Sequence, residues 1–246
     1  MFDDARLSQL NTEWSLIVAA HQSADPGAAR DAQAELLPAY CAAIYRYVQG
    51  AIHDPPAAEN LCQEFAFRFV RGDFRHARPE KGRFRDYLKA SLFHLVGEYY
   101  REKRDRDRPI PSDGRLLIGE RTGPDTDRLF LESWRQEILN RTWTGLRGEF
   151  PGPSPTPYDV LRRKADDPAI TSQMQANAFT EATGRPSTAA NIRQLLHRGR
   201  ERFAELLRLE VAATVQSHDP ATIDEELAEM GLLVYCPRTA ATPFEP

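Results

Sequence analysis

The chain has 246 residues, 41% of them apolar and 28% charged, which is typical of a globular protein with one large core or two small ones. Its apolar runs fall far short of the roughly 20 residues that span a bilayer. The N-terminus opens on an acidic segment rather than on the basic and apolar regions of a signal peptide. Cys41, Cys62 and Cys236 are odd in number and far apart. We therefore expect a cytoplasmic protein with reduced thiols and no membrane association.

Charge is distributed unevenly, although the net charge is only −4. Residues 68–108 hold thirteen Lys and Arg against seven Asp and Glu, and residues 185–208 hold six Arg against two Glu. In contrast, residues 1–67 carry a net charge of −6 and residues 216–246 a net charge of −5. Two separate basic segments indicate two surfaces that attract phosphate. Solvated helix faces would explain the same charges equally well.

Apolar residues recur at helical spacing along nearly the whole chain, and no stretch shows the alternation of a strand. Leu37, Tyr40, Ile44 and Val48 share one helix face, and we expect Pro38 to break or begin that helix. The sequence therefore predicts an all-α fold.

Capping and breaking residues place the other elements. Asp54-Pro55 and Asp219-Pro220 are each typical of a helix start. A long helix rich in basic and aromatic residues is expected over 83–104. Residues 107–127 contain prolines and glycines with little periodicity and predict a linker, and the proline-rich residues 150–157 predict a loop.

A short helix, a turn at Gly184 and a longer helix form a helix-turn-helix pattern in the second half. The outward residues of the longer helix are Thr188, Asn191, Arg193, Gln194, His197, Arg198 and Arg200. Arginine can bind guanine through two hydrogen bonds, asparagine and glutamine can bind adenine, and further arginines can bind phosphates. The pattern predicts a helix that reads duplex DNA, and a plain helical bundle remains the alternative.

Residues with catalytic or metal-binding spacing are scarce. The six histidines are scattered, none has a partner at ligand spacing, and no glycine-rich loop follows a strand. We therefore expect a protein that is not an enzyme and has no metal and no cofactor.

Two further segments carry distinctive motifs. The first is Ala58 to Phe69, followed by Pro79-Glu-Lys-Gly-Arg-Phe-Arg-Asp-Tyr-Leu88, and the second is Ile192-Arg-Gln-Leu-Leu-His-Arg-Gly-Arg-Glu-Arg-Phe203. They resemble regions 2 and 4, respectively, of the sigma-70 family of bacterial RNA polymerase sigma factors. Both segments occur in the family's order, and the flanking segments resemble a group of extracytoplasmic-function (ECF) sigma factors abundant in planctomycetes.

The resemblance implies two small helical domains, at 11–106 (region 2-like) and 128–215 (region 4-like helix-turn-helix), joined by the linker 107–127 and followed by an acidic tail, 216–246. It implies a factor for transcription initiation that binds core RNA polymerase through the β′ clamp helices and the β flap and directs it to promoter DNA. An anti-sigma factor or another regulator is a further expected partner.

The resemblance also assigns roles to single residues. The seven outward residues of the longer helix would read the minus-thirty-five element. Residues expected to bind and melt the minus-ten element are Arg83, Arg85, Tyr87, Lys89, His94, Tyr100, Arg101, Lys103 and Arg104. This mixture of aromatics and cations suits a single strand, which needs stacking surfaces and phosphate contacts. Residues expected to bind core polymerase are Glu59, Asn60, Gln63, Glu64 and Arg68.

Other functions remain open at this point. The alternatives are a helix-turn-helix transcription regulator, a degenerate sigma-like protein that binds DNA or polymerase without initiating, and a helical adaptor. For the acidic tail we expect either regulation, by docking across helix 192–203 and masking its DNA-binding surface, or simple capping of the second domain.

Overall fold

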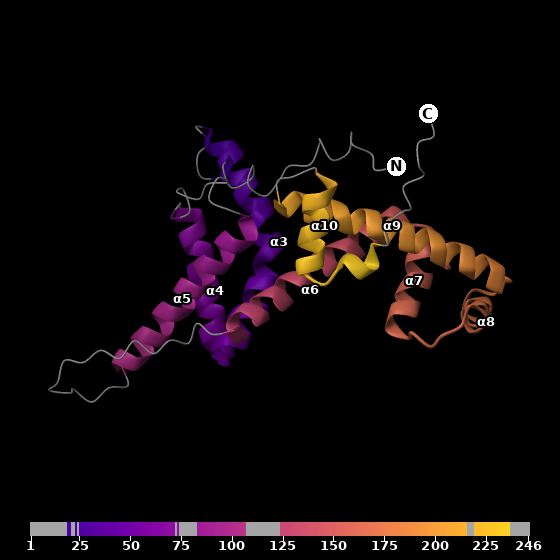
Figure 1. Ribbon diagram of the computed structural model, residues 1–246, viewed down its shortest axis with the longest axis horizontal. Coiled ribbons are helices and arrows are strands. Elements are labelled where there is room, and N and C mark those ends of the chain that lie inside the picture. Colours follow the sequence, from indigo (N-terminus) through magenta and orange to yellow (C-terminus); the bar gives the residue numbers. More distant parts are fainter. Residues whose placement is uncertain are drawn as a thin grey trace. The chain divides into compact units, whose positions relative to one another are not determined.

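The computed structural model describes residues 19–20, 23, 25–71, 73, 83–106, 124–215 and 219–236 (Figure 1). Regular structure in these ranges is helical throughout, which confirms the all-α prediction. The helices are α3 (Pro26–Ile52), α4 (Pro55–Arg71), α5 (Phe84–Arg106), α6 (Pro124–Glu149), α7 (Pro157–Asp166), α8 (Ser172–Thr183), α9 (Ala189–Val215), α10 (Pro220–Glu229) and the short 3-10 helix η2 (Leu233–Tyr235). No helix of the described ranges combines the length and apolarity that a membrane span requires.

The first long helix begins earlier than expected. α3 starts at Pro26, where the Asp25 side chain caps it by accepting a hydrogen bond from the Gly27 amide. The helix continues through Pro38, so the prediction that Pro38 breaks or begins it is wrong. A proline inside a helix costs roughly 3 kcal/mol. Burial of residues on both sides, such as Ala32 and Tyr40, offsets this cost.

Contacts divide the chain into two compact units, and the boundary falls inside α6. The N-terminal unit runs to Glu137 and also includes the last residues of α9, from Ala212 on. The C-terminal unit runs from Ile138 to Val211 and continues from Asp219 with α10. In the N-terminal unit, the first half of α6 packs on α3. The Trp134 ring stacks on Tyr40 with centroids 5.2 Å apart, and Arg46 donates to the Glu137 carboxylate at 2.8 Å. The domain boundaries expected from the sequence stay a prediction, although residues 124–127 of the expected linker form the first turn of α6.

The tail helix contributes to the core of the C-terminal unit. Its apolar residues Ile223, Leu227, Met230 and Leu232 are buried, and Leu233 is half-buried. The Arg208 guanidinium binds the Asp224 carboxylate, and the Cys236 thiol lies 3.7 Å from the Ala204 carbonyl oxygen. These contacts hold the tail against the later turns of α9. The outward residues of α9 remain exposed, so the described part of the tail caps the unit and does not mask the expected DNA-binding surface.

A capping box starts α7. The Thr156 hydroxyl accepts a hydrogen bond from the Asp159 amide at 3.2 Å, and the Asp159 carboxylate accepts one from the Thr156 amide at 2.9 Å. Burial alone would raise the pKa of Asp159, but hydrogen bonds from Ser154 and Thr156 outweigh it and lower that pKa. The cap is therefore strongest when Asp159 is ionised.

We expect Thr156→Ala to lower the free energy of unfolding by about 1 kcal/mol at neutral pH. The folded-state pKa of Asp159 is depressed, so its contribution is present above the unfolded value of about 3.9 and is lost as the pH falls through the lower folded value. Urea denaturation at several pH values measures both effects. Thr144→Ala, at an exposed position of α6, is the control and should change stability by less than about 0.5 kcal/mol.

Candidate nucleic-acid interface

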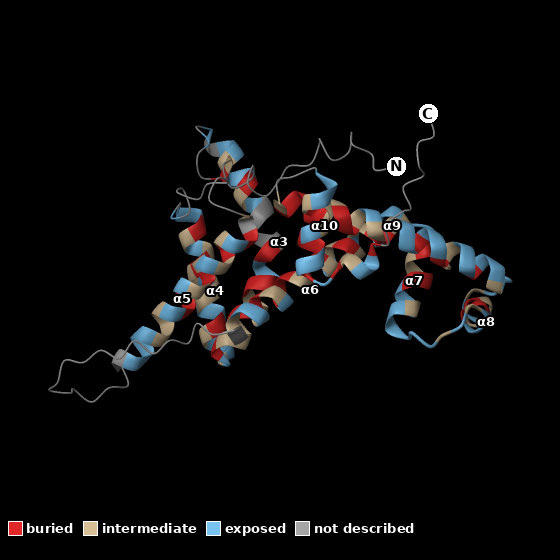
Figure 2. Ribbon diagram, in the orientation of Figure 1, coloured by how far each residue is buried: buried red, intermediate tan, exposed pale blue. Residues whose placement is uncertain are grey.

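α9 carries its polar side chains away from its buried stripe. Ile192, Leu196 and Phe203 are buried and lie on the inward side of the helix. The residues that reach solvent include all seven that the sequence assigned to DNA, Thr188, Asn191, Arg193, Gln194, His197, Arg198 and Arg200 (Figure 2). The structure therefore brings six of these residues together on the exposed part of α9, with Thr188 directly before its first residue.

The turn before α9 explains how the helix is positioned. Gly184 ends α8 in the left-handed conformation, with φ of 67°, and its amide donates to the Thr180 carbonyl. A side chain is strained at such a φ, which favours glycine there. The Thr188 hydroxyl then accepts a hydrogen bond from the Asn191 amide at 3.1 Å and caps the start of α9. Thr188 is thus a capping residue, whatever else it contacts.

Sequence reasoning missed one acid on this surface. Glu201 lies 3.3 Å from His197, one helical turn further along, and both side chains are exposed. The spacing of four residues could have indicated this pair. Glu201 reduces the positive charge next to His197, which leaves Arg193, Arg198 and Arg200 as the exposed arginines among the seven expected residues.

The nine residues expected to bind the minus-ten element are not all on the surface. His94, Arg101, Lys103 and Arg104 are exposed on α5, and Arg83, Tyr87, Lys89 and Tyr100 are half-buried. Arg85 is only 3% exposed. In this structure Arg85 therefore offers no surface to a ligand, unlike the cations at the C-terminal end of α5.

Tyr100 and Lys89, two of the half-buried residues, bond to neighbouring helices. The Tyr100 hydroxyl donates to the Ala51 carbonyl at 2.8 Å and ties α5 to the end of α3. Lys89 binds the Asp127 carboxylate of α6 at 2.7 Å. Burial raises the pKa of Tyr87, so this phenol stays neutral at physiological pH. Tyr87 and Tyr100 were expected as surface aromatics, and the structure uses Tyr100 to join two helices.

The expected polymerase-binding residues occupy α4. Glu59, Asn60 and Gln63 are exposed, whereas Glu64 and Arg68 are half-buried and paired. Arg68 lies 2.7 Å from Glu64 and 2.8 Å from Glu98 of α5. Hydrogen bonding to Glu64 is the main cause of the raised pKa of Arg68.

Two apolar residues of α4 were missed by sequence reasoning. Phe67 is 57% exposed and Val70 is 54% exposed, and the Arg71 guanidinium lies 5.3 Å from the Phe67 ring centroid. Helical spacing places Phe67 and Val70 on the same side as Gln63, opposite the buried Phe65. An exposed face that mixes apolar and polar side chains is typical of a protein-binding surface.

Comparisons with known proteins return no relative: no protein-family model matches the chain, and no curated protein or solved structure matches it. Among the described residues, no cluster of three or more His, Cys, Asp or Glu side chains could hold a metal ion.

Proposed function

We propose that this protein is an ECF-type sigma factor, which binds core RNA polymerase and directs it to promoters. The observation that carries the proposal is the exposed polar surface of α9, which follows a glycine turn in a chain whose overall charge is negative. A local cluster of arginines on an acidic protein is expected where phosphate must be bound. The resemblance to regions 2 and 4 supplies the rest of the argument.

Each further surface supports one part of this function. The mixed face of α4 suits a contact with the β′ clamp helices, because its exposed Phe67 and Val70 can be buried by a partner. The exposed cations Arg101, Lys103 and Arg104 at the end of α5 suit the backbone of promoter DNA.

The deciding experiment is run-off transcription with purified core polymerase, the full chain and the DNA upstream of its own coding region. A discrete transcript that depends on both proteins supports the proposal. Polymerase that binds the protein but yields no transcript from this DNA or from a library of genomic fragments would contradict it.

A DNA-binding protein that does not open the duplex is the second candidate. It is favoured by the burial of Arg85 and by the contacts that occupy Tyr100 and Lys89, since these leave fewer aromatics and cations for a single strand. Permanganate footprinting separates the two functions: reactive thymines near the minus-ten position indicate an opened duplex, and protection without reactivity indicates duplex binding alone.

We expect Arg193→Ala and Arg198→Ala each to reduce DNA affinity by about 1–3 kcal/mol, the value of a two-bond contact to a base. Each change should relax preference at one base pair. Fluorescence anisotropy on duplexes selected from a random pool measures both effects. Arg202→Ala is the control, because the Arg202 guanidinium is held by Glu149 and Glu205. A loss that is equal for all duplexes would make Arg193 and Arg198 phosphate contacts.

We expect the double change Phe67→Ser and Val70→Ser to weaken binding to core polymerase about tenfold, because buried apolar anchors dominate protein interfaces. Both side chains are more than half exposed, so the change should leave the fold intact. Met174→Ser on α8 is the matched control, since Met174 is also 54% exposed. Equal binding of the double variant and the control would remove α4 from the interface.

A further inference from the structure

A row of aromatic rings crosses the C-terminal unit. It consists of Tyr235, Phe203, Trp143 and Tyr158. The ring centroids of neighbours lie 6.5 Å apart for Phe203 and Tyr235, 4.6 Å for Trp143 and Phe203, and 6.0 Å for Trp143 and Tyr158. Residues from α6, α7, α9 and η2 therefore form one connected row, in which Phe203 is buried and the other three rings reach the surface.

Two arginines lie over this row. The Arg162 guanidinium is 5.2 Å from the Trp143 ring centroid, and the Arg147 guanidinium is 6.0 Å from that of Tyr158. Both arginines are exposed, and both aromatics are half-buried. A guanidinium stacked on a ring keeps its N–H groups at the edge, where they can bind a carboxylate through two hydrogen bonds. We call these six residues the aromatic–arginine row.

Nearby acids do not satisfy the arginines fully. Arg162 binds the Asp166 carboxylate through two nitrogens, at 3.3 Å and 3.2 Å, but both side chains are exposed and one helical turn apart, so the pair is weak and an incoming carboxylate must displace it. Asp159 affects Arg147 electrostatically, yet its carboxylate already accepts hydrogen bonds in the capping box of α7. An incoming carboxylate can therefore compete for both guanidinium groups.

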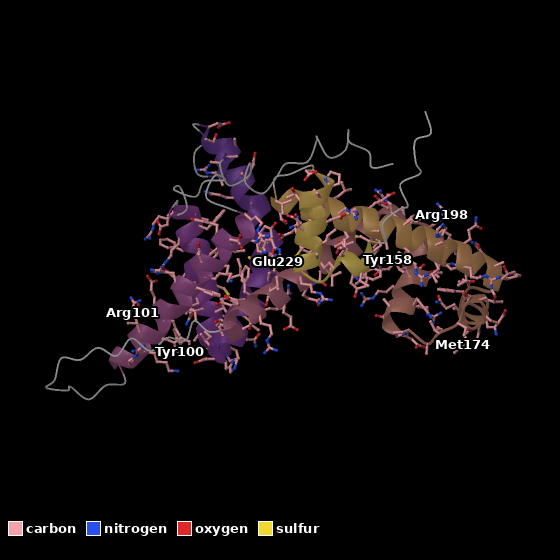
Figure 3. The ribbon with its side chains drawn as sticks, in the orientation of Figure 1. Tyr100, Arg101, Tyr158, Met174, Arg198 and Glu229 are labelled. Atoms are coloured by element: carbon pink, nitrogen blue, oxygen red, sulfur yellow. The ribbon has the colours of Figure 1, made fainter. Side chains whose placement is uncertain are left out.

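The row and Arg198 lie on different sides of α9. Trp143 packs on Phe203, a buried residue on the inward side of α9, whereas Arg198 is exposed on that helix. In Figure 3, Arg198 projects from the side of α9 away from α7, the helix that carries Tyr158. Arg200, in contrast, lies about one helical turn before Phe203.

Apolar exposure at one end of the row favours a protein partner over nucleic acid. Val234 is 77% exposed and Tyr235 is 45% exposed, next to Phe203. Phosphates cannot bury such side chains, but an amphipathic polypeptide can. In addition, the faces of Trp143 and Tyr158 are covered by arginines, so bases could stack there only by displacing them.

We propose that the aromatic–arginine row is a docking surface for a partner protein, through an amphipathic segment that carries acidic and apolar side chains. The acids would bind Arg147 and Arg162, and the apolar side chains would cover Val234 and Tyr235. This inference does not depend on the proposed transcriptional function.

The test is an NMR titration of the full ¹⁵N-labelled chain, read at the indole N–H signals, with the Trp143 signal assigned by Trp143→Phe. The probe is a short synthetic helical peptide with leucines on one face and glutamates along the edge of that face, so that both kinds of side chain can meet the row. We expect the peptide to shift the Trp143 signal and to leave that of the buried Trp134 unchanged. The double change Arg147→Gln and Arg162→Gln should weaken peptide binding about tenfold.

Arg163→Gln is the matched control, because Arg163 is exposed on the same helix and lies over Phe179 instead of the row. It should leave the affinity unchanged, and an unshifted Trp134 signal in each free variant reports an intact fold. The proposal fails if the double variant binds the peptide as well as Arg163→Gln does. It also fails if a random DNA duplex shifts the Trp143 signal as strongly as the peptide, which would make the row a nucleic-acid surface. No polymerase or promoter enters this assay, so its outcome is independent of the sigma-factor proposal.

Discussion

Trp134→Ala is expected to destabilise the protein by about 3–5 kcal/mol, the usual cost of removing a large aromatic side chain from a core. Trp134 is 1% exposed and stacks on Tyr40, and its centroid lies 6.2 Å from that of Phe130. The loss should appear in the N-terminal unit, because these partners belong to α3 and to the first half of α6. Hydrogen exchange by mass spectrometry should show faster exchange in α3 and unchanged exchange in α7 and α9.

Trp143→Ala is the reciprocal control. Trp143 belongs to the C-terminal unit and contacts Phe203 and Tyr158, so its removal should speed exchange in α7 and α9. The opposite result for Trp134→Ala would be faster hydrogen exchange in α9 and unchanged exchange in α3. It would place the first half of α6 in the second domain, in agreement with the domain boundary predicted at residue 128.

Gly199→Ala should cost about 1–3 kcal/mol of stability, since overpacking outweighs the gain of roughly 1 kcal/mol that alanine brings to a helix. A Cβ atom at Gly199 would lie 2.7 Å from the Pro157 carbonyl oxygen and 3.3 Å from the Leu161 Cβ. The first atom belongs to the backbone of α7, so α7 would have to move away from α9. Thermal and urea denaturation measure this loss.

Gly148→Ala provides the comparison, because no atom of the described residues lies within 4 Å of the place that a Cβ atom would take there. Gly148 is also exposed, near the end of α6. This change should be neutral or slightly stabilising. Equal stability of the two variants would mean that α7 moves at no cost and that the close approach at Gly199 is not a packing constraint.

Local features of the chain were predictable because they depend on neighbours in the sequence. Asp54 caps α4 by accepting from the Ala57 amide at 3.2 Å, and Asp219 caps α10 through the Thr222 amide at 3.1 Å. Hydrogen bonding to Thr222 is the main reason that the pKa of Asp219 is lowered. The inward stripe of α9 followed from spacing in the same way, so its outward residues could be named as a candidate site.

For the candidate sites on α4 and α5, the exposure of single side chains was harder to predict. Helical spacing shows which residues share a face but not whether a neighbouring helix packs on that face. Arg85 looked like a surface cation, yet the fold buries it. Phe67 and Val70 received no role from the sequence, yet α4 leaves both apolar side chains exposed. In each case the exposed fraction depends on neighbouring helices.

The sequence by itself determined the helical class, the caps Asp54 and Asp219 and the polar surface of α9, since these follow from interactions within about one helical turn. Only the tertiary structure decided that α3 continues through Pro38, that α6 contributes to both units, and that Gly199 faces the Pro157 carbonyl. These features depend on packing between segments far apart in the chain. The free energy of burial at these contacts outweighs the local conformational preferences of the residues. The spacing of residues along the sequence does not reveal which distant segments make such contacts.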